Sequence, residues 1–190
     1  MSVSTWEDAA DRGRPAARPS WHLRPDLASP PSDFGIIVDT REQLPYFQGR
    51  AWAARGTLKS GDYSLAGYQG RVALERKSLA DAYGTFGRGR ERFESELTRL
   101  AAMDRAALLI EATYRQFLDP EILDPCWRSR VRPASVEGSV LAWSHRYGVE
   151  VLFAGGRMLS ERLVFRWLAS WWLEAQERGL PRDDDWEAIL

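Results

Sequence analysis

The chain has 190 residues, of which 44% are hydrophobic and 28% charged, the size and composition of one globular domain. Its single cysteine, Cys126, excludes an internal disulfide and a cysteine-based zinc site. A net charge of −1 argues against a non-specific nucleic-acid coat protein. No apolar run reaches the roughly 18 residues of a membrane span, and the N-terminus lacks the apolar core of a signal peptide, so we expect a cytoplasmic protein without a membrane partner.

Three regions are expected along the chain. Residues 1–33 are rich in Pro, Arg and Ser and lack periodicity, which is typical of an extended or partly disordered arm. Residues 34–180 carry periodic apolar patterns and form the folded domain. Residues 181–190 form an acidic C-terminal tail.

Within the folded domain, short buried strands alternate with helical patterns. The predicted strands are residues 35–39, 61–66, 71–75, 106–111 and 149–153, the second and third forming a hairpin. The predicted helices are a short one that Ser78 caps and Gly84 breaks, and three longer ones over residues 90–103, 133–147 and 156–179. Residues 119–132 are expected to be a loop. This alternation predicts an α/β domain with a central mixed sheet flanked by helices.

Carboxylates gather at the ends of the predicted strands. Asp39 ends the first strand and is followed by Glu42, Asp62 opens the hairpin and Glu75 closes it. Because the hairpin folds back on itself, Asp62 and Glu75 meet at one edge of the sheet. Adjacent carboxylates repel each other unless a cation lies between them, and hard oxygen ligands of this kind suit Mg²⁺ or Mn²⁺. Any one of these acids, taken alone, is more often solvated than functional.

A lysine lies beside the proposed metal site. Lys77 is two positions beyond Glu75 and so shares its face of an extended strand. There its amine could orient or deprotonate a water that attacks phosphorus. Of 26 basic residues only Lys59 and Lys77 are lysines; a lysine that persists in such a chain is suited to giving up a proton, which arginine does not do.

The chain resembles the nuclease domain of XPF-type structure-specific endonucleases. The resemblance is carried by Val38-Asp39-Thr40-Arg41-Glu42, by Gly61-Asp62-Tyr63, and by Glu75-Arg76-Lys77 with Asp81 four residues after the lysine. It extends more weakly over residues 35–172. It implies a restriction-endonuclease-like fold and Mg²⁺- or Mn²⁺-dependent hydrolysis of DNA, with a preference for branched, flapped or junction substrates.

The resemblance also implies roles for individual residues. Asp62, Glu75 and Asp39 become metal ligands, Glu42 supports the metal or the water, and Lys77 lies nearest the attacking water. Arginines are expected to orient carboxylates or bind phosphates, and these are Arg41, Arg76, Arg88 and Arg90. Asp81 fits the last position of the motif, although a helix-capping role is about equally well supported.

Other features allow more than one interpretation. The cluster Arg128, Arg130 and Arg132 could bind DNA or simply be a solvated loop. The apolar stripe of the last helix, which includes Trp167 and Trp171, is either buried or a homodimer surface.

Family members usually carry a tandem helix-hairpin-helix module, which this sequence lacks, so we expect a stand-alone member of phage or bacterial type, nucleoid-associated in a bacterial or phage-infected cell. The functional alternatives are a catalytically silent nuclease-like DNA-binding or scaffold module, and a junction resolvase or defence nuclease of the same fold.

Overall fold

A computed structural model of the chain describes residues 29–87 and 89–183. Most of the expected N-terminal arm, Arg88, and the tail beyond residue 183 lie outside the described residues. Residues 29–33 form neither helix nor strand.

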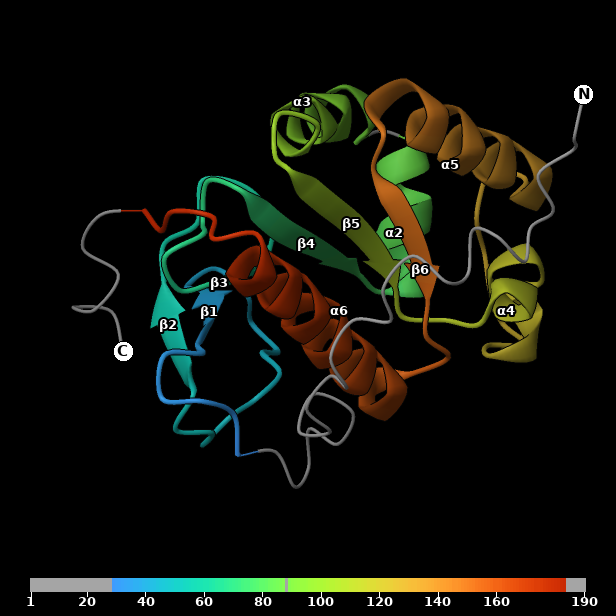
Figure 1. The fold of residues 1–190 in the computed structure, drawn as a ribbon. Coiled ribbons are helices and arrows are strands. Elements are labelled where there is room, and N and C mark those ends of the chain that lie inside the picture. Colours follow the sequence, from blue (N-terminus) through green and yellow to red (C-terminus); the bar gives the residue numbers. More distant parts are fainter. Residues whose placement is uncertain (1–28, 88, 184–190) are drawn as a thin grey trace, which may run out of the picture.

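The described residues build one mixed sheet (Figure 1). Its strands are β1 (Ile36–Asp39), β2 (Ala53–Gly56), β3 (Tyr63–Leu65), β4 (Val72–Lys77), β5 (Arg105–Ile110) and β6 (Glu150–Phe153). Their order is β2-β1-β3-β4-β5-β6. β3 runs antiparallel to both of its neighbours, whereas the other pairs are parallel. The central mixed sheet predicted from the sequence is therefore confirmed.

Helices cover both faces of the sheet (Figure 1). They are α2 (Leu79–Phe86), α3 (Arg90–Leu100), α4 (Tyr114–Leu118), the short 3-10 helix η2 (Pro120–Ile122), α5 (Pro133–Tyr147) and α6 (Arg157–Glu177). α6 packs on one face through Val164, Phe165 and Leu168. α2, α3 and α5 pack on the other face and form a second core.

The alternation of β4 sends neighbouring side chains into different cores. Val72 and Leu74 pack in the core that contains α6, whereas Ala73 packs in the core that contains α2, α3 and α5. Because side chains alternate along a strand, Arg76 continues the first row, and Glu75 and Lys77 continue the second. The functional residues at the end of β4 are thus divided between the two faces of the sheet.

Three local predictions need correction. α2 does not stop at Tyr83 but continues through Gly84 to Phe86, because Phe86 buries its ring against Trp143. β2 and α4 were not predicted, and α4 interrupts the stretch between β5 and the expected loop.

The apolar stripe of the last helix turns inward. Trp171 and Trp172 of α6 are buried, and Leu163 and Trp167 are partly buried against the same core. These residues serve the core, so this stripe does not provide the homodimer surface that was considered for it; dimerisation itself stays a prediction.

None of the helices in the described ranges has the combination of length and apolar character needed to cross a bilayer.

Candidate active site

The ends of three strands converge at one edge of the sheet. The amide of Asp39, at the end of β1, donates to the carbonyl of Asp62 (2.8 Å), and the amide of Asp62 donates to the carbonyl of Leu74 in β4 (2.9 Å). Tyr63 pairs with Leu74 across the hairpin. The hairpin therefore brings Asp62 beside Glu75, as the sequence predicted.

Asp62 and Glu75 form a carboxylate pair that is largely shielded from solvent. Burial and the charge of Glu75 raise the pKa of Asp62 to about 8, against a hydrogen bond from the amide of Arg76 (2.8 Å) that lowers it. Burial also raises the pKa of Glu75, although the neighbouring ammonium of Lys77 lowers it, and the charges of Glu96 and Glu42 raise it further. Each carboxylate is thus destabilised in its ionised form, and a cation placed between them would remove much of that destabilisation.

Lys77 lies directly against this pair. Its Nζ is 3.0 Å from Oε1 of Glu75 and 4.4 Å from the ring centre of Phe93 on α3. Both side chains of the ion pair are only 14% exposed. The amine is therefore held at the carboxylates on an apolar platform, where it can reach a water on the same face of β4.

Glu96 of α3 closes this side of the site and was not singled out from the sequence. Its Oε1 accepts a hydrogen bond from the amide of Gly61 (3.0 Å), and Oε2 pairs with Arg99. The sequence contains a weak signal that Glu96 faces the interior. Glu96 lies three residues after the buried Phe93 and one before the buried Leu97, at the border of the apolar face of the helix.

The opposite face of β4 carries a network around Arg76. The side chain of Arg76 is 11% exposed and contacts Glu111, Glu42 (3.4 Å) and the hydroxyl of Tyr46 (2.9 Å). Glu42 also accepts a hydrogen bond from the amide of Leu44 (2.8 Å). Arg76 therefore orients carboxylates, one of its two expected roles, and its guanidinium is not free to bind a substrate phosphate. Glu111 comes directly after the end of β5, much as Asp39 stands at the end of β1. This strand-end position is a sequence signal by which Glu111 could have been predicted as a site residue.

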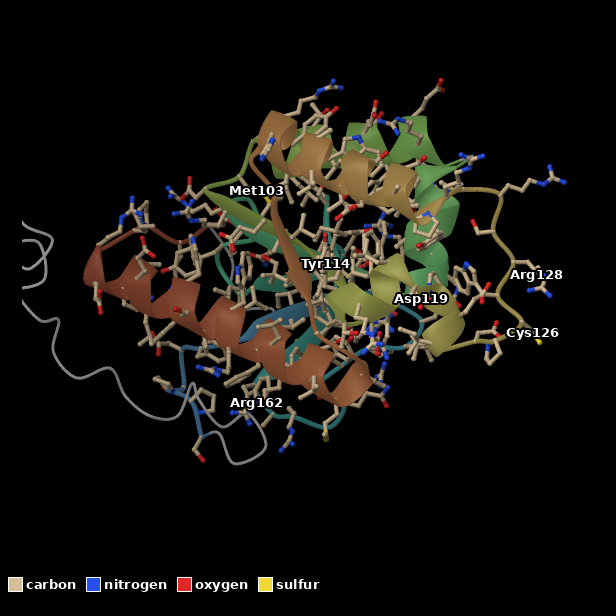
Figure 2. All side chains as sticks on the ribbon, turned by 90° about the vertical axis from the view of Figure 1, so that its right-hand side faces the viewer. Met103, Tyr114, Asp119, Cys126, Arg128 and Arg162 are labelled. Atoms are coloured by element: carbon tan, nitrogen blue, oxygen red, sulfur yellow. The ribbon has the colours of Figure 1, made fainter. Side chains whose placement is uncertain are left out.

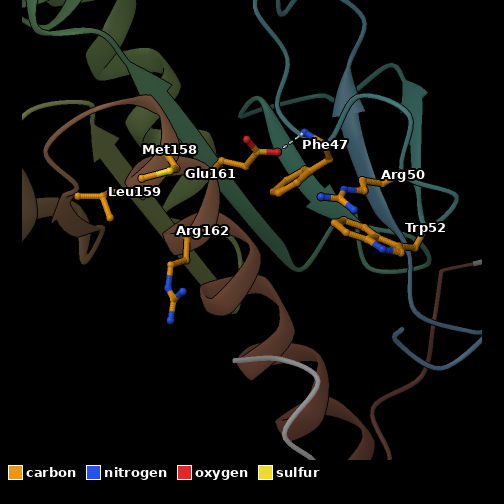
Figure 3. Close-up of a pocket in the computed structure, with 7 residues that line it drawn as sticks. All are labelled: Phe47, Arg50, Trp52, Met158, Leu159, Glu161 and Arg162. Carbon is orange, nitrogen blue, oxygen red and sulfur yellow. Dashed lines mark hydrogen bonds between the residues drawn. The ribbon is translucent and has the colours of Figure 1, made fainter. Parts of the chain in front are cut away.

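A loop from Leu44 to Phe47 is held against this network by α6. Arg157 donates to the carbonyls of Leu44 (3.0 Å) and Pro45 (2.8 Å), and its guanidinium lies over the ring of Tyr46. The amide of Phe47 donates to Glu161 (2.9 Å), the dashed contact in Figure 3. Phe47 has a positive φ of 62°, an unfavourable conformation for a bulky residue that these contacts stabilise.

A cavity of about 310 Å³ lies on the outer side of that loop. It is lined by Phe47, Arg50, Trp52, Met158, Leu159, Glu161 and Arg162 (Figure 3). None of the predicted catalytic residues lines it, and its one carboxylate already accepts from Phe47. We therefore place the chemistry at the strand ends and not in this cavity.

The carboxylate of Asp39 at the end of β1 already accepts hydrogen bonds on both oxygens. Burial would raise the pKa of Asp39, but hydrogen bonds from Arg41 and from the amide of Leu58 outweigh it and lower the pKa. Oδ1 accepts from the amide and Nε of Arg41 (2.8 and 2.7 Å), and Oδ2 accepts from Nη2 of Arg41 (3.0 Å) and from Leu58 (2.8 Å). These four donors use the four lone-pair sites of a carboxylate, which argues against the metal-ligand role expected for Asp39.

The remaining predicted residues have other partners. Arg41 is committed to Asp39 and to the carbonyl of Leu58 (2.9 Å). Arg90 pairs with Glu94 (3.0 Å), donates to Ser139 (3.1 Å) and lies over Trp143, so it links α3 to α5. The carboxylate of Asp81 contacts the capping Ser78 (2.6 Å), in agreement with its capping interpretation.

The acid pair is compatible with a divalent ion. Across residues 29–87 and 89–183 there is no group of three or more His, Cys, Asp or Glu side chains that could hold a metal ion. Mg²⁺, however, is commonly bound by one or two carboxylates, with waters and substrate phosphates completing its shell. Asp62 and Glu75 supply two neighbouring carboxylates with hard oxygen atoms, which fits that requirement.

Comparison with known proteins places the chain in a family. The family described as "ERCC4 domain" matches residues 38–169. XPF from Aeropyrum pernix is similar in structure, with a TM-score of 0.54 and 22% sequence identity over 72% of this chain and 60% of that one. XPF from Aeropyrum pernix in complex with DNA has a TM-score of 0.52 and 19% identity over 74% of this chain and 66% of that one.

The chain spans less than two thirds of either XPF chain, and no curated protein matches it. The resemblance to XPF-type nuclease domains inferred from the motifs and the restriction-endonuclease-like fold are both confirmed. Since the matched residues cover more than half of the sequence, the chain belongs to the ERCC4 domain family.

Proposed function

We propose that this protein is a DNA endonuclease that hydrolyses phosphodiester bonds with the help of Mg²⁺ or Mn²⁺. The observation that carries the proposal is the convergence of Asp62, Glu75 and Lys77 on one face of the sheet edge, with Lys77 Nζ 3.0 Å from Glu75. The DNA complex of the structurally similar XPF supports DNA as the substrate class.

Each residue then has a separate task. Asp62 and Glu75 would hold the divalent ion, which would supply positive charge beside the scissile phosphate. Lys77, whose Nζ lies 3.0 Å from Glu75, would orient the attacking water and, in its neutral form, accept the proton of that water at Nζ. Glu42, fixed by Arg76 and the amide of Leu44, would position the water from the other side of the strand end.

The preference for branched or flapped DNA rests on family membership and is part of the proposal. The proposal also includes nuclease action on DNA junctions, homodimerisation and a cytoplasmic location. A catalytically silent module is the principal alternative, and a test of cleavage separates it from the enzyme.

The test is a panel of linear, flapped, forked and four-way DNA substrates incubated with Mg²⁺, Mn²⁺ or a chelator. We expect cleavage of at least one branched substrate with either ion and none with the chelator. Glu75→Ala should reduce the cleavage rate by about 10³-fold or more, since it removes half of the proposed ion site. The matched control is Glu174→Ala on α6, whose exposed carboxylate pairs only with Arg178 among the described residues.

Full activity of Glu75→Ala would disprove the proposed chemistry. Binding of branched DNA by the unaltered protein with no cleavage under any condition would favour the silent module. Cleavage of the four-way substrate in preference to the flapped and forked substrates would instead favour a resolvase of the same fold.

A further inference from the structure

An open groove lies on the α2 side of the sheet, outside the proposed active site. Residues of α2 line one wall, and residues of the loop between η2 and α5 line the other. Its volume is about 680 Å³, and its lining includes Ala80, Gly84 and Gly87 on the helix side and Trp127, Arg128 and Arg130 on the loop side. Figure 2 shows the loop with Arg128 projecting from one end of the molecule, away from Arg162 on α6.

The loop is fastened to the domain on both sides of its arginines. The ring of Trp127 packs edge-on against Tyr83 of α2 (5.2 Å), and the Tyr83 hydroxyl donates to the carbonyl of Phe117 (2.7 Å). Val131 is partly buried against the core of α2, α3 and α5. The segment from Arg128 to Arg130, here called the arginine arch, is therefore a short span between two anchors.

The arch presents positive charge to the groove. Arg128 and Arg130 are both exposed, and Nη1 of Arg128 uses one contact, to the carbonyl of Trp127 (2.8 Å). Arg130 has no ion pair or side-chain hydrogen bond with any residue of the described ranges. The one acid that lines the groove, Asp124, already accepts from the amide of Cys126 (2.9 Å).

The opposite wall has few side-chain atoms. A Cβ built at Gly84 would meet nothing within 4 Å, and Gly84 and Gly87 are both exposed. Glycine allows a ligand to approach the main chain closely. Arginines and exposed glycines that line the same groove form a surface suited to a negatively charged, extended strand.

The groove also lies close to the site. α2 begins at Leu79, two residues after Lys77, and both Lys77 and α2 are on the same face of the sheet as Phe93. From Ala80 to Gly87 the helix advances about 10 Å, at 1.5 Å per residue. This length corresponds to roughly three steps of a DNA strand, which rises 3.4 Å per nucleotide.

We propose that this groove binds the sugar–phosphate backbone of the DNA strand a few nucleotides from the scissile phosphate, with Arg128 and Arg130 as the phosphate-contacting residues. The inference deepens the proposed function and depends on DNA being the substrate. The sequence left two interpretations open for these arginines, DNA binding and a solvated loop, and this proposal selects DNA binding.

The test measures binding of a fluorescently labelled forked DNA, in chelator to prevent cleavage, over a series of salt concentrations. Each neutralised phosphate contributes about 0.9 to the slope of log K against log salt. Arg128→Ala/Arg130→Ala should therefore weaken binding by roughly tenfold and lower the slope by about 1.8. Arg128→Lys/Arg130→Lys should keep most of the slope, since an ammonium also neutralises a phosphate as a point charge.

The matched control is Arg162→Ala/Arg166→Ala, which removes the same charge from exposed positions on α6, across the sheet. It should leave affinity, slope and cleavage unchanged, and all three variants should keep the melting temperature of the parent. An equal loss of affinity in the control would show a diffuse charge effect and overturn the proposal. Parental binding by the double alanine variant would also overturn it.

These outcomes are separable from those of the proposed function. If Glu75-dependent cleavage occurs while the double alanine variant binds and cleaves like the parent, only the groove assignment fails. If the parent neither binds nor cleaves DNA, the proposed function fails with it.

Discussion

Charged residues at the end of β4 acquire their roles from the side of the strand on which they lie. Glu75 and Lys77 share the face of α2 and α3, where Phe93 and Glu96 complete their surroundings. Arg76, between them, faces Tyr46 and Glu111 instead. The period of two along the strand thus separates reacting groups from positioning groups, although the three residues are consecutive.

Some residues of the candidate site could be predicted from the sequence, and others could not. The meeting of Asp62 and Glu75 was predictable because it depends only on the hairpin register. Glu96 and Glu111 reach the site through the packing of α3 and β5, and the local sequence gives only a weak signal for either residue. The motif position of Asp39 does not reveal that Arg41 and Leu58 donate to both of its carboxylate oxygens, which favours a structural role for this residue.

Replacing Lys77 by arginine tests its proton-transfer role. Guanidinium keeps its proton at any working pH, and it is planar where the amine is compact. We expect Lys77→Arg to lower the maximal cleavage rate by about 10²-fold or more while DNA affinity in chelator is retained. Single-turnover cleavage at saturating enzyme measures this, with Lys59→Arg, an exposed lysine, as the control. A nearly normal rate would remove the proton-transfer role.

Asp39 tests the structural role that its contacts indicate. Asp39→Asn removes the charge that Arg41 neutralises and replaces an acceptor with a donor facing Arg41 or Leu58. A buried charged hydrogen bond is worth about 2 kcal/mol, so we expect the free energy of unfolding to fall by about that amount. Urea unfolding in chelator measures it. Asp104→Asn, whose pair with Arg71 is exposed, should cost under about 0.5 kcal/mol; equal losses in both would contradict the assignment.

At the scale of elements, strongly patterned segments were predictable and contact-dependent ones were not. The buried runs of β1 and β5 and the apolar faces of α3 and α6 are visible in the sequence. β2 has the composition Ala-Ala-Arg-Gly, with low strand propensity, and it is a strand because it pairs with β1. α4 has five residues and is fixed by the capping box of Thr113 and Gln116, a signal that was present but brief.

The first turn of α6 holds the loop that carries part of the site. Arg157 binds the carbonyls of Leu44 and Pro45 and covers Tyr46, whose hydroxyl contacts Arg76. We expect Arg157→Ala to release this loop, to lower stability by about 1 kcal/mol and to reduce kcat by about tenfold, because Glu42 and Arg76 lose their fixed positions.

The split between kcat and KM distinguishes this positioning role from a general loss of fold. KM should change little, and Arg157→Lys should recover part of the rate through one of the two carbonyl contacts. Arg162→Ala, one turn further along α6, is the control for helix stability. An Arg157→Ala protein with lower stability and normal kcat would restrict Arg157 to a folding role.

At the scale of the whole molecule, two cores on opposite faces support one sheet edge. The core that contains α6 fixes the loop from Leu44 to Phe47, and the core that contains α2, α3 and α5 presents the carboxylate pair with Lys77. The site is therefore built from segments far apart in sequence, and its carboxylates are held in place at the expense of electrostatic repulsion.

That repulsion predicts a link between metal binding and global stability. A ligand that binds only the folded state stabilises it by about 2.7 kcal/mol at 100 times its dissociation constant, which corresponds to roughly 5–10 °C for a domain of this size. We expect saturating Mn²⁺ to raise the melting temperature of the parent protein by this order. Glu75→Gln should lose most of the increment, since an amide is a poor substitute for a carboxylate ligand. Glu174→Gln, which changes an exposed side chain of α6, should keep it. Calorimetry with and without Mn²⁺ gives all three increments without relying on cleavage, and equal increments in parent and Glu75→Gln would place the ion elsewhere than between Asp62 and Glu75.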